Sequence, residues 1–79
     1  MILEVRVFGG LEKRMPGAIY GKPIEMNVPG GTTVADLLRM LKIPEQDVFT
    51  TLVNGIHSNR EYTLNPGDRV AFFPPVGGG

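Results

Sequence analysis

The chain has 79 residues, with eight acidic and eight basic side chains and no cysteine. A domain of this size buries only ~60% of the surface that its unfolded chain exposes, so we expect one domain with a thin hydrophobic core. The lack of cysteine excludes disulfides, thiolate metal sites and a thiol nucleophile, while the balanced charge argues against binding to nucleic acid or to an anionic membrane.

The N-terminal segment predicts a β-strand. Leu3, Val5 and Val7 alternate with Glu4 and Arg6, which is the period-two pattern of a strand with one buried face. Because charged residues interrupt this segment, it does not resemble an export signal, and no other segment approaches the length of a membrane span. We therefore expect a soluble, cytoplasmic protein.

A second strand is predicted from Ile24 to Val28, where apolar and polar side chains again alternate before Pro29-Gly30-Gly31. The connection between the two strands, Gly9 to Lys22, has no clear periodicity. Within it, LEKRM is expected to form a single helical turn that Pro16 ends.

One amphipathic helix is predicted in the middle of the chain. Thr33 and Asp36 have the spacing of a capping box, in which each side chain accepts a hydrogen bond from a backbone N–H of the other residue. The residues that follow at i, i+3, i+4 and i+7 form one apolar stripe: Val34, Leu37, Leu38 and Leu41. Pro44 limits the length of this helix, whose stripe we interpret as an ordinary core face.

The last third of the chain predicts strands separated by tight turns. Phe49 to Val53 is rich in β-forming residues and runs into Asn54-Gly55, a strong tight-turn signal. A short strand is expected around Arg60 to Tyr62. The turn at Asn65-Pro66-Gly67-Asp68 then leads into a final strand, Arg69 to Phe73.

The order of these elements predicts an α+β domain in which one helix crosses one face of a mixed sheet of four to five strands. A right-handed crossover would place the final strand parallel to the first and beside it. This is the β-grasp, or ubiquitin-like, arrangement, and we expect it to occupy residues 1–73. A small barrel of the SH3 or OB type is the alternative, but it does not accommodate the periodic helix.

Residues 74–79 are predicted to form a tail. Phe72 and Phe73 point to opposite faces of the last strand, so one is expected in the core and the other near the surface. Pro74-Pro75 favours an extended conformation and serves as a stiff spacer. From Pro74 to Gly79 the tail can reach roughly 20 Å from the sheet, at ~3.3 Å per extended residue.

The glycines that follow have no side chains, so the backbone could pass through a channel that is closed to other residues. Ordering three of them costs about 3 to 6 kcal/mol, which a partner that grips the domain or the spacer must offset. The α-carboxylate of Gly79 is the one reactive group at this end. Attack on the α-phosphate of ATP would convert it into an acyl-adenylate open to a sulfur or amine nucleophile. An inert glycine-rich end is the alternative interpretation.

The C-terminal third, VNG followed by LNPGDRVAFFPPVGGG, resembles the small subunit of molybdopterin synthase (MoaD), within the MoaD/ThiS ubiquitin-like sulfur carriers. Members of that family commonly end in G-D-x-V-A-x-x-P-P-V-x-G-G. The matching positions here are Gly67, Asp68, Val70, Ala71, Pro74, Pro75, Val76, Gly78 and Gly79. The first strand, the capped helix and the Asn-Gly turn also fall where the family would place them.

The resemblance implies a sulfur carrier that has no bound cofactor or metal and no side-chain active site. An adenylating enzyme related to MoeB and ThiF would use Mg-ATP to activate Gly79, and a donor such as a cysteine desulfurase would supply the sulfur of a thiocarboxylate. Gly77 and Gly78 would enter a channel of the large synthase subunit (MoaE), while Phe73, Pro74, Pro75 and Val76 would dock on the partners. The sulfur would pass to a precursor pterin for a molybdenum or tungsten cofactor.

Two features depart from the family pattern. Gly77 occupies a position where Ala or Ser is more usual, and the Gly9 to Lys22 connection does not clearly reproduce the helix often found after the first strand. A ubiquitin-like modifier that is conjugated through Gly79, or a sulfur carrier for thiamine or tRNA, therefore stays open as an alternative.

The remaining candidate side chains have ordinary explanations. His57 is expected to be an exposed loop residue, and Asp68 to shape its turn through backbone hydrogen bonds. Tyr20 and Tyr62 are expected to be packing or rim residues. Phe8, together with Phe73, could form an apolar docking patch, although a place in the core explains each nearly as well.

Overall fold

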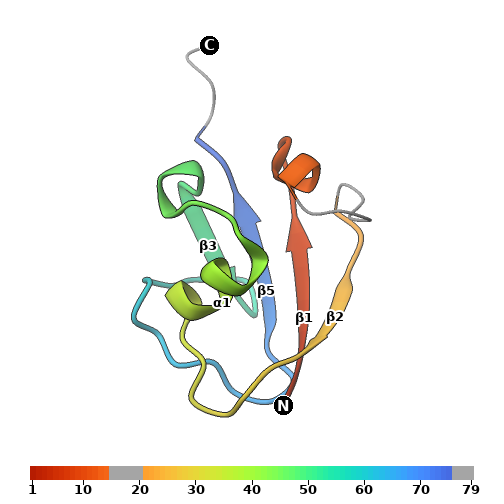
Figure 1. Ribbon diagram of the computed structural model, residues 1–79, viewed down its shortest axis with the longest axis vertical. Coiled ribbons are helices and arrows are strands. Elements are labelled where there is room, and N and C mark those ends of the chain that lie inside the picture. The colour runs from red at the N-terminus through yellow and green to blue at the C-terminus, as the bar shows by residue number, and fades with distance from the viewer. Residues whose placement is uncertain (15–20, 76–79) are drawn as a thin grey trace.

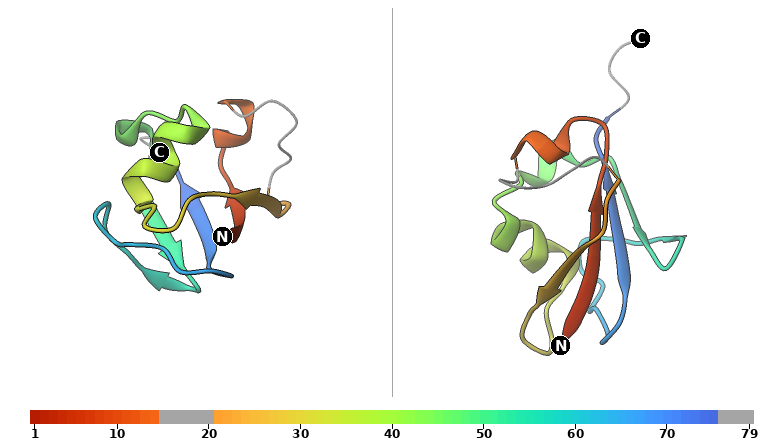
Figure 2. Two further views of the ribbon diagram at one scale, coloured as in Figure 1. Left: turned by 60° about the horizontal axis from the view of Figure 1, so that its bottom comes forward. Right: turned by 90° about the vertical axis from the view of Figure 1, so that its right-hand side faces the viewer.

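The computed structural model describes residues 1–14 and 21–75. They form a five-stranded mixed sheet with one α-helix against one of its faces, which confirms the predicted β-grasp arrangement and excludes a small barrel (Figures 1 and 2). The elements are β1 (Ile2–Val7), a 3-10 turn η1 (Leu11–Arg14), β2 (Ile24–Asn27), α1 (Val34–Leu41), a 3-10 turn η2 (Glu45–Asp47), β3 (Thr50–Val53), β4 (Ile56–His57) and β5 (Arg69–Phe73).

The sheet has the order β2-β1-β5-β3-β4, so the first and last strands lie side by side at its centre. They pair in parallel, as predicted, with Val5 opposite Val70 and Val7 opposite Phe72. All other neighbouring strands are antiparallel. Because β1 and β5 point the same way, the end of β5 and the loop between β1 and η1 meet at one end of the molecule (Figure 1).

The core lies between the sheet and α1, where the alternating apolar residues of β1 and β5 face the apolar stripe of the helix. Its largest fully buried side chains are Leu3, Val5, Val7, Val34, Leu37, Leu38, Val70 and Phe72. Leu41, the fourth residue of the predicted stripe, is half-buried and packs against the rim of this cluster. The opposite face of the sheet carries no helix (Figure 2).

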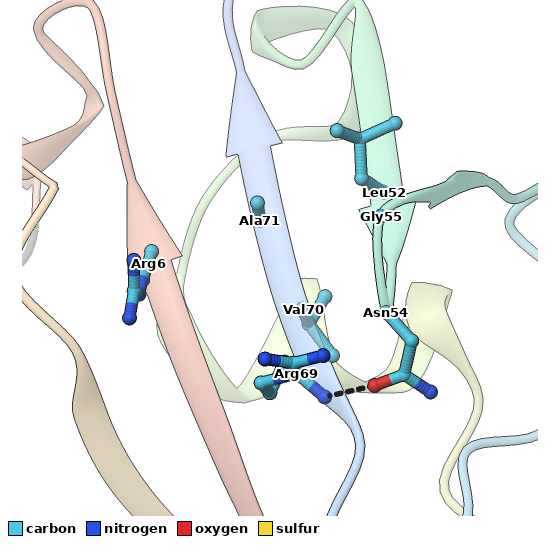
Figure 3. Close-up of a pocket in the computed structure, with 7 residues that line it drawn as sticks. All are labelled: Arg6, Leu52, Asn54, Gly55, Arg69, Val70 and Ala71. Carbon is cyan, nitrogen blue, oxygen red and sulfur yellow. Dashed lines mark hydrogen bonds between the residues drawn. The ribbon is translucent and has the colours of Figure 1, made fainter.

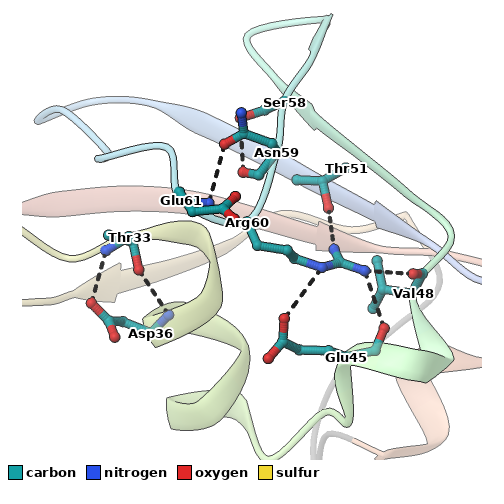
Figure 4. A network of polar contacts seen from close by, with 9 residues as sticks. All are labelled: Thr33, Asp36, Glu45, Val48, Thr51, Ser58, Asn59, Arg60 and Glu61. Atoms are coloured by element: carbon teal, nitrogen blue, oxygen red, sulfur yellow. Dashed lines mark hydrogen bonds and ion pairs between the residues drawn. The ribbon is translucent and has the colours of Figure 1, made fainter.

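The predicted capping box at the start of α1 is present (Figure 4). The Asp36 N–H donates to Thr33 Oγ1 and the Thr33 N–H donates to Asp36 Oδ2, each at 3.1 Å. The hydrogen bond from the Thr33 N–H, with help from the neighbouring Arg39, lowers the pKa of Asp36 below its ordinary value of 3.8. Lys42, in the left-handed conformation, caps the C-terminal end of the helix. Within residues 1–14 and 21–75 no helix is long and apolar enough to cross a membrane.

The prediction of a short strand around Arg60 to Tyr62 was wrong, because the strand lies earlier, at Ile56–His57, directly after the Asn54-Gly55 turn. Arg60 instead holds η2 against the sheet (Figure 4). Its guanidinium donates to the carbonyls of Glu45 and Val48 at 3.1 and 2.7 Å and to Thr51 Oγ1 at 3.1 Å. The third strand was predicted from Phe49, but β3 begins one residue later, at Thr50. The Phe49 side chain is 74% exposed.

Candidate functional site

The candidate site is the C-terminal tail, of which the structure describes the root. Val76, Gly77, Gly78 and Gly79 lie outside the described residues, so their predicted roles and the domain boundary after residue 73 stay predictions. Phe73 and Pro74 are half-buried and Pro75 is exposed.

The last strand is held by both of its neighbours up to its final residue. On one side the Phe8 N–H donates to the Phe72 carbonyl at 3.1 Å, and on the other the Phe49 N–H donates to the Phe73 carbonyl at 2.8 Å. Pro74 has no N–H to continue either ladder, and the strand ends there. The tail therefore starts from a fixed backbone position.

Two aromatic rings stack beside this exit. The ring centroids of Phe8 and Phe73 are 4.5 Å apart, and the rings are within 6° of parallel. Both side chains are half-buried. Each comes directly after an inward-facing residue, Val7 or Phe72, and therefore points to the outer face of the sheet. The prediction that Phe72 and Phe73 serve opposite faces is confirmed, and the stack forms an apolar surface at the root of the tail.

Pro74 lies on the helix side of the root, against the loop that joins β1 to η1. Its ring contacts Gly9 so closely that a Cβ on that glycine would overlap it. A shallow hollow of about 250 Å³ beside this contact is lined by Gly9, Gly10, Leu11, Gln46, Asp47, Pro74 and Pro75. The root is thus in contact with protein on both faces.

The helix-free face of the sheet has an open hollow of about 240 Å³ (Figure 3). Its floor is formed by the half-buried side chains of Leu52 and Ala71, which are paired across β3 and β5. The guanidinium groups of Arg6 and Arg69 lie at its border, and Arg6 also forms an exposed ion pair with Glu4 at 3.4 Å. This surface combines a small apolar floor with positive charge.

The other described candidate side chains lie away from the root of the tail. His57 is exposed, although it lies in β4 and not in a loop, and Tyr62 is 39% exposed at the rim. Asp68 accepts from the Asn65 N–H at 2.8 Å and so shapes its turn. Tyr20 lies outside the described residues, and no group of three possible metal ligands occurs within residues 1–14 and 21–75.

The contact of Gly9 with Pro74 was not predicted, because no local signal connects residues from opposite ends of the chain. The stack of Phe8 on Phe73 had a usable signal. Once β1 and β5 are taken as parallel, with Val7 opposite Phe72, the next residue on each strand faces outward and the two rings become neighbours.

Comparisons with known proteins agree with this geometry. The model of the ThiS family matches residues 17–79. Over the whole chain the fold resembles the solution structure of the Haloferax volcanii HVO 2177 protein, with 31% identity, 87% coverage of that chain and a TM-score of 0.76. It also resembles SAMP1 from Haloferax volcanii, with 26% identity, full coverage of both chains and a TM-score of 0.72.

The fold is shared with a third structure, a complex of subunits 1 and 2 of the molybdopterin-converting factor from Helicobacter pylori. The identity is 24% over the full length of both chains, with a TM-score of 0.63. A search of curated protein sequences returned no match. The match to the family model continues through the terminal glycines.

Proposed function

Because this chain belongs to the ThiS family, we propose that it is a sulfur carrier whose cargo is bound at the carboxyl end of Gly79. The observation that carries the proposal is that the family match continues through Gly79, beyond the residue at which the sheet ends. The ordered root supports it, since β5 delivers Pro74 and the residues after it to one defined point of the surface.

The chemistry needs no side chain of the carrier. A carboxylate oxygen of Gly79 would attack the α-phosphorus of ATP in an adenylating enzyme, with release of pyrophosphate. A persulfide sulfur would then attack the acyl carbon of the adenylate and AMP would leave, giving an acyl disulfide. A thiol of the sulfur donor would cleave its S–S bond, forming a disulfide with the donor and releasing Gly79 as a thiocarboxylate. Mg²⁺ and ATP would belong to the activating enzyme, and the sulfur would come from a donor such as a cysteine desulfurase.

The folded domain would supply the binding energy for these encounters. Ordering the three terminal glycines in a partner's channel costs about 3 to 6 kcal/mol, which a tail without side chains cannot offset by its own contacts. The Phe8–Phe73 stack provides apolar area beside the exit, and the hollow between Arg6 and Arg69, nearer the start of β5 on the same helix-free face, adds charge. We propose this face as the surface that docks on the adenylating enzyme.

At the finer level we propose that the chain is the small subunit of a molybdopterin synthase. Its ending shares the Pro-Pro-Val spacer and terminal glycine pair of that branch. Its fold is that of one chain in a complex of subunits 1 and 2 of the molybdopterin-converting factor from Helicobacter pylori. The partner would then be a large, MoaE-like subunit whose channel receives Gly77 and Gly78 and in which sulfur passes to a precursor pterin.

Intact mass spectrometry tests the proposal. The protein is incubated with a cognate adenylating enzyme, Mg-ATP and a sulfur donor, and the mass is expected to change by the replacement of one oxygen by sulfur at the C-terminus. Deletion of Gly79, or addition of one residue after it, should abolish adenylation and leave the melting temperature nearly unchanged. Adenylation of either variant would show that the chemistry is not at this end.

A ubiquitin-like modifier is the second candidate, because one of the similar structures is a small archaeal modifier protein of Haloferax volcanii with 26% identity. In that role Gly79 would form an isopeptide bond with lysines of other proteins. Purification from cells distinguishes the two. A free thiocarboxylate and co-elution with a large subunit favour the carrier, whereas a ladder of covalent adducts favours the modifier. Thiolation of a thiamine precursor or of tRNA by the purified carrier would instead assign it to those pathways.

A further inference from the structure

The contact between Gly9 and Pro74 is unusually close. Gly9 has a φ of +64°, a conformation that side chains with a Cβ rarely adopt. A Cβ built on this residue would lie 2.6 Å from Pro74 Cγ and 2.8 Å from Pro74 Cδ. Both distances are shorter than carbon atoms tolerate, so any other residue at position 9 would displace the proline ring or the loop.

The neighbouring glycine shows that this crowding is specific to one position. Gly10 also has a positive φ, +102°, but a Cβ built there has no other described atom within 4 Å. Both glycines therefore satisfy a backbone requirement of the turn after β1. Only Gly9 satisfies a packing requirement as well, and the group that it accommodates is the first residue of the tail.

The root of the tail is consequently confined from two sides. On the helix-free side the Phe73 ring is stacked on Phe8, and Phe8 in turn lies against Gly21, where a Cβ would be 3.1 Å from its Cε1. On the other side the ring of Pro74 rests on the bare Cα of Gly9. Because the Phe73 carbonyl is also hydrogen-bonded to the Phe49 N–H, the backbone at this point has little freedom to rotate.

We propose that Gly9 is a positioning residue, which sets the direction in which residues 74–79 leave the domain and so aims Gly79 at the α-phosphate of ATP in the adenylating enzyme. This inference rests on the proposed carrier function. Two consecutive prolines form a stiff spacer, so a small rotation at Pro74 becomes a displacement of several ångströms at the end of a roughly 20 Å tail. Misplacement of a reacting group by about 1 Å can reduce the rate on the order of 100-fold.

The test compares Gly9→Ala with Gly10→Ala in the full-length protein. Both variants place an alanine at a positive φ, so both should lower the melting temperature, and Gly9→Ala should lower it further because its Cβ also meets the Pro74 ring. Adenylation is measured as pyrophosphate exchange with a cognate adenylating enzyme, at a temperature where both variants are fully folded. For Gly9→Ala we expect kcat to fall on the order of 10- to 100-fold with KM for the carrier little changed, because the docking face is intact. For Gly10→Ala both constants should stay near those of the wild type.

A second pair of variants tests whether Gly9 acts through Pro74. Pro74→Ala removes the ring atoms that a Cβ at position 9 would meet. If the clash is the cause, adding Gly9→Ala to Pro74→Ala should have little further effect on kcat, and the double variant should be more active than Gly9→Ala alone. Independent losses that multiply in the double variant would overturn the inference.

The outcome also separates this inference from the proposed function. Failure of the wild type to be adenylated contradicts the carrier function, whereas adenylation of the wild type and of Gly9→Ala at equal kcat contradicts the positioning role alone. If Gly9→Ala does not fold, the epistasis is measured with Gly9→Asn, because asparagine keeps the Cβ and tolerates a positive φ better than alanine. If neither variant folds, nuclear Overhauser contacts in the wild type decide: close contact between the Gly9 α-protons and the Pro74 ring supports the inference, and its absence refutes it.

Discussion

The start of α1 and the end of β5 are both element termini with well-defined geometry, but they are held in different ways. At α1 the two side chains of the capping box are Thr33 and Asp36, three residues apart, and the N–H groups of Val34 and Ala35 donate to backbone carbonyls of the segment after β4. At β5 the partners come from the other end of the chain, as Phe8 stacks on Phe73 and Gly9 accommodates Pro74.

The two termini therefore contribute to different properties, the stability of the domain and the position of the tail. The cap stabilises a helix whose apolar face is core, so its loss should be felt in the free energy of unfolding. The root of the tail adds little to the core but defines where the terminal glycines begin. Perturbations at α1 should therefore change stability without changing adenylation by the folded protein, whereas those at the surface of the root should change adenylation by more than their modest loss of stability explains.

The largest expected effect is that of Phe72→Ala, which should change both stability and adenylation. Phe72 is fully buried and lies one residue before the root, so Phe72→Ala should destabilise the domain by about 3–5 kcal/mol and thereby lower adenylation in proportion to the unfolded fraction. Chemical denaturation monitored by circular dichroism measures the loss. Because natural domains have only about 5–15 kcal/mol of stability, partial unfolding at 37 °C is expected. A cost below 1 kcal/mol would contradict the assignment of Phe72 to the core.

Substitution of the adjacent Phe73 should affect binding of the adenylating enzyme more than the stability of the domain. Phe73→Ala removes the ring that stacks on Phe8, and the aromatic interaction itself contributes about 0.5–1.5 kcal/mol. We expect a modest loss of stability together with a rise in KM for the carrier in adenylation, on the order of tenfold. Phe49→Ala serves as the control for stability, because that side chain is 74% exposed. An unchanged KM for Phe73→Ala would remove the stack from the docking surface.

A cap variant tests the opposite half of the comparison. Thr33→Ala removes the side-chain acceptor for the Asp36 N–H and should cost about 1 kcal/mol of stability. Thr33→Ser, which keeps the hydroxyl, is the matched control and should be close to the wild type. Both variants should be adenylated with wild-type kcat and KM when folded. A kinetic defect in Thr33→Ala alone would mean that the helix terminus contributes to the site.

The smallest effect is the pH dependence of the same cap. The pKa of Asp36 is lowered in the folded state, chiefly by the hydrogen bond from the Thr33 N–H, so its carboxylate contributes stability above pH 3.8 that is lost as the pH falls through the folded-state pKa. The difference in unfolding free energy between wild type and Asp36→Asn should therefore shrink below pH 3.8. A difference that stays constant from pH 7 to pH 2 would show that the charge of Asp36 has no role.

The comparison also explains which sequence predictions were confirmed. The capped helix and four of the five strands follow from periodicity and turn residues within short windows. The short strand was misplaced because Ile56–His57 is exposed and too short to show an alternating pattern. The position of Arg60 is fixed by hydrogen bonds from its guanidinium to the carbonyls of Glu45 and Val48, which no pattern near residue 60 indicates. The contact between Gly9 and Pro74 had no local signal at all.

The sequence by itself determined the α+β class, the helix with its cap, the parallel pairing of the first and last strands, and the expectation that the chemistry belongs to Gly79. These follow from side-chain periodicity, chain connectivity and a recognisable ending, all of which are properties of order along the chain. Only the tertiary structure decided that Phe8 stacks on Phe73 and that Gly9 leaves room for Pro74. Such contacts depend on the register between β1 and β5 and on the shape of a loop, and both exist only after the chain has closed on itself.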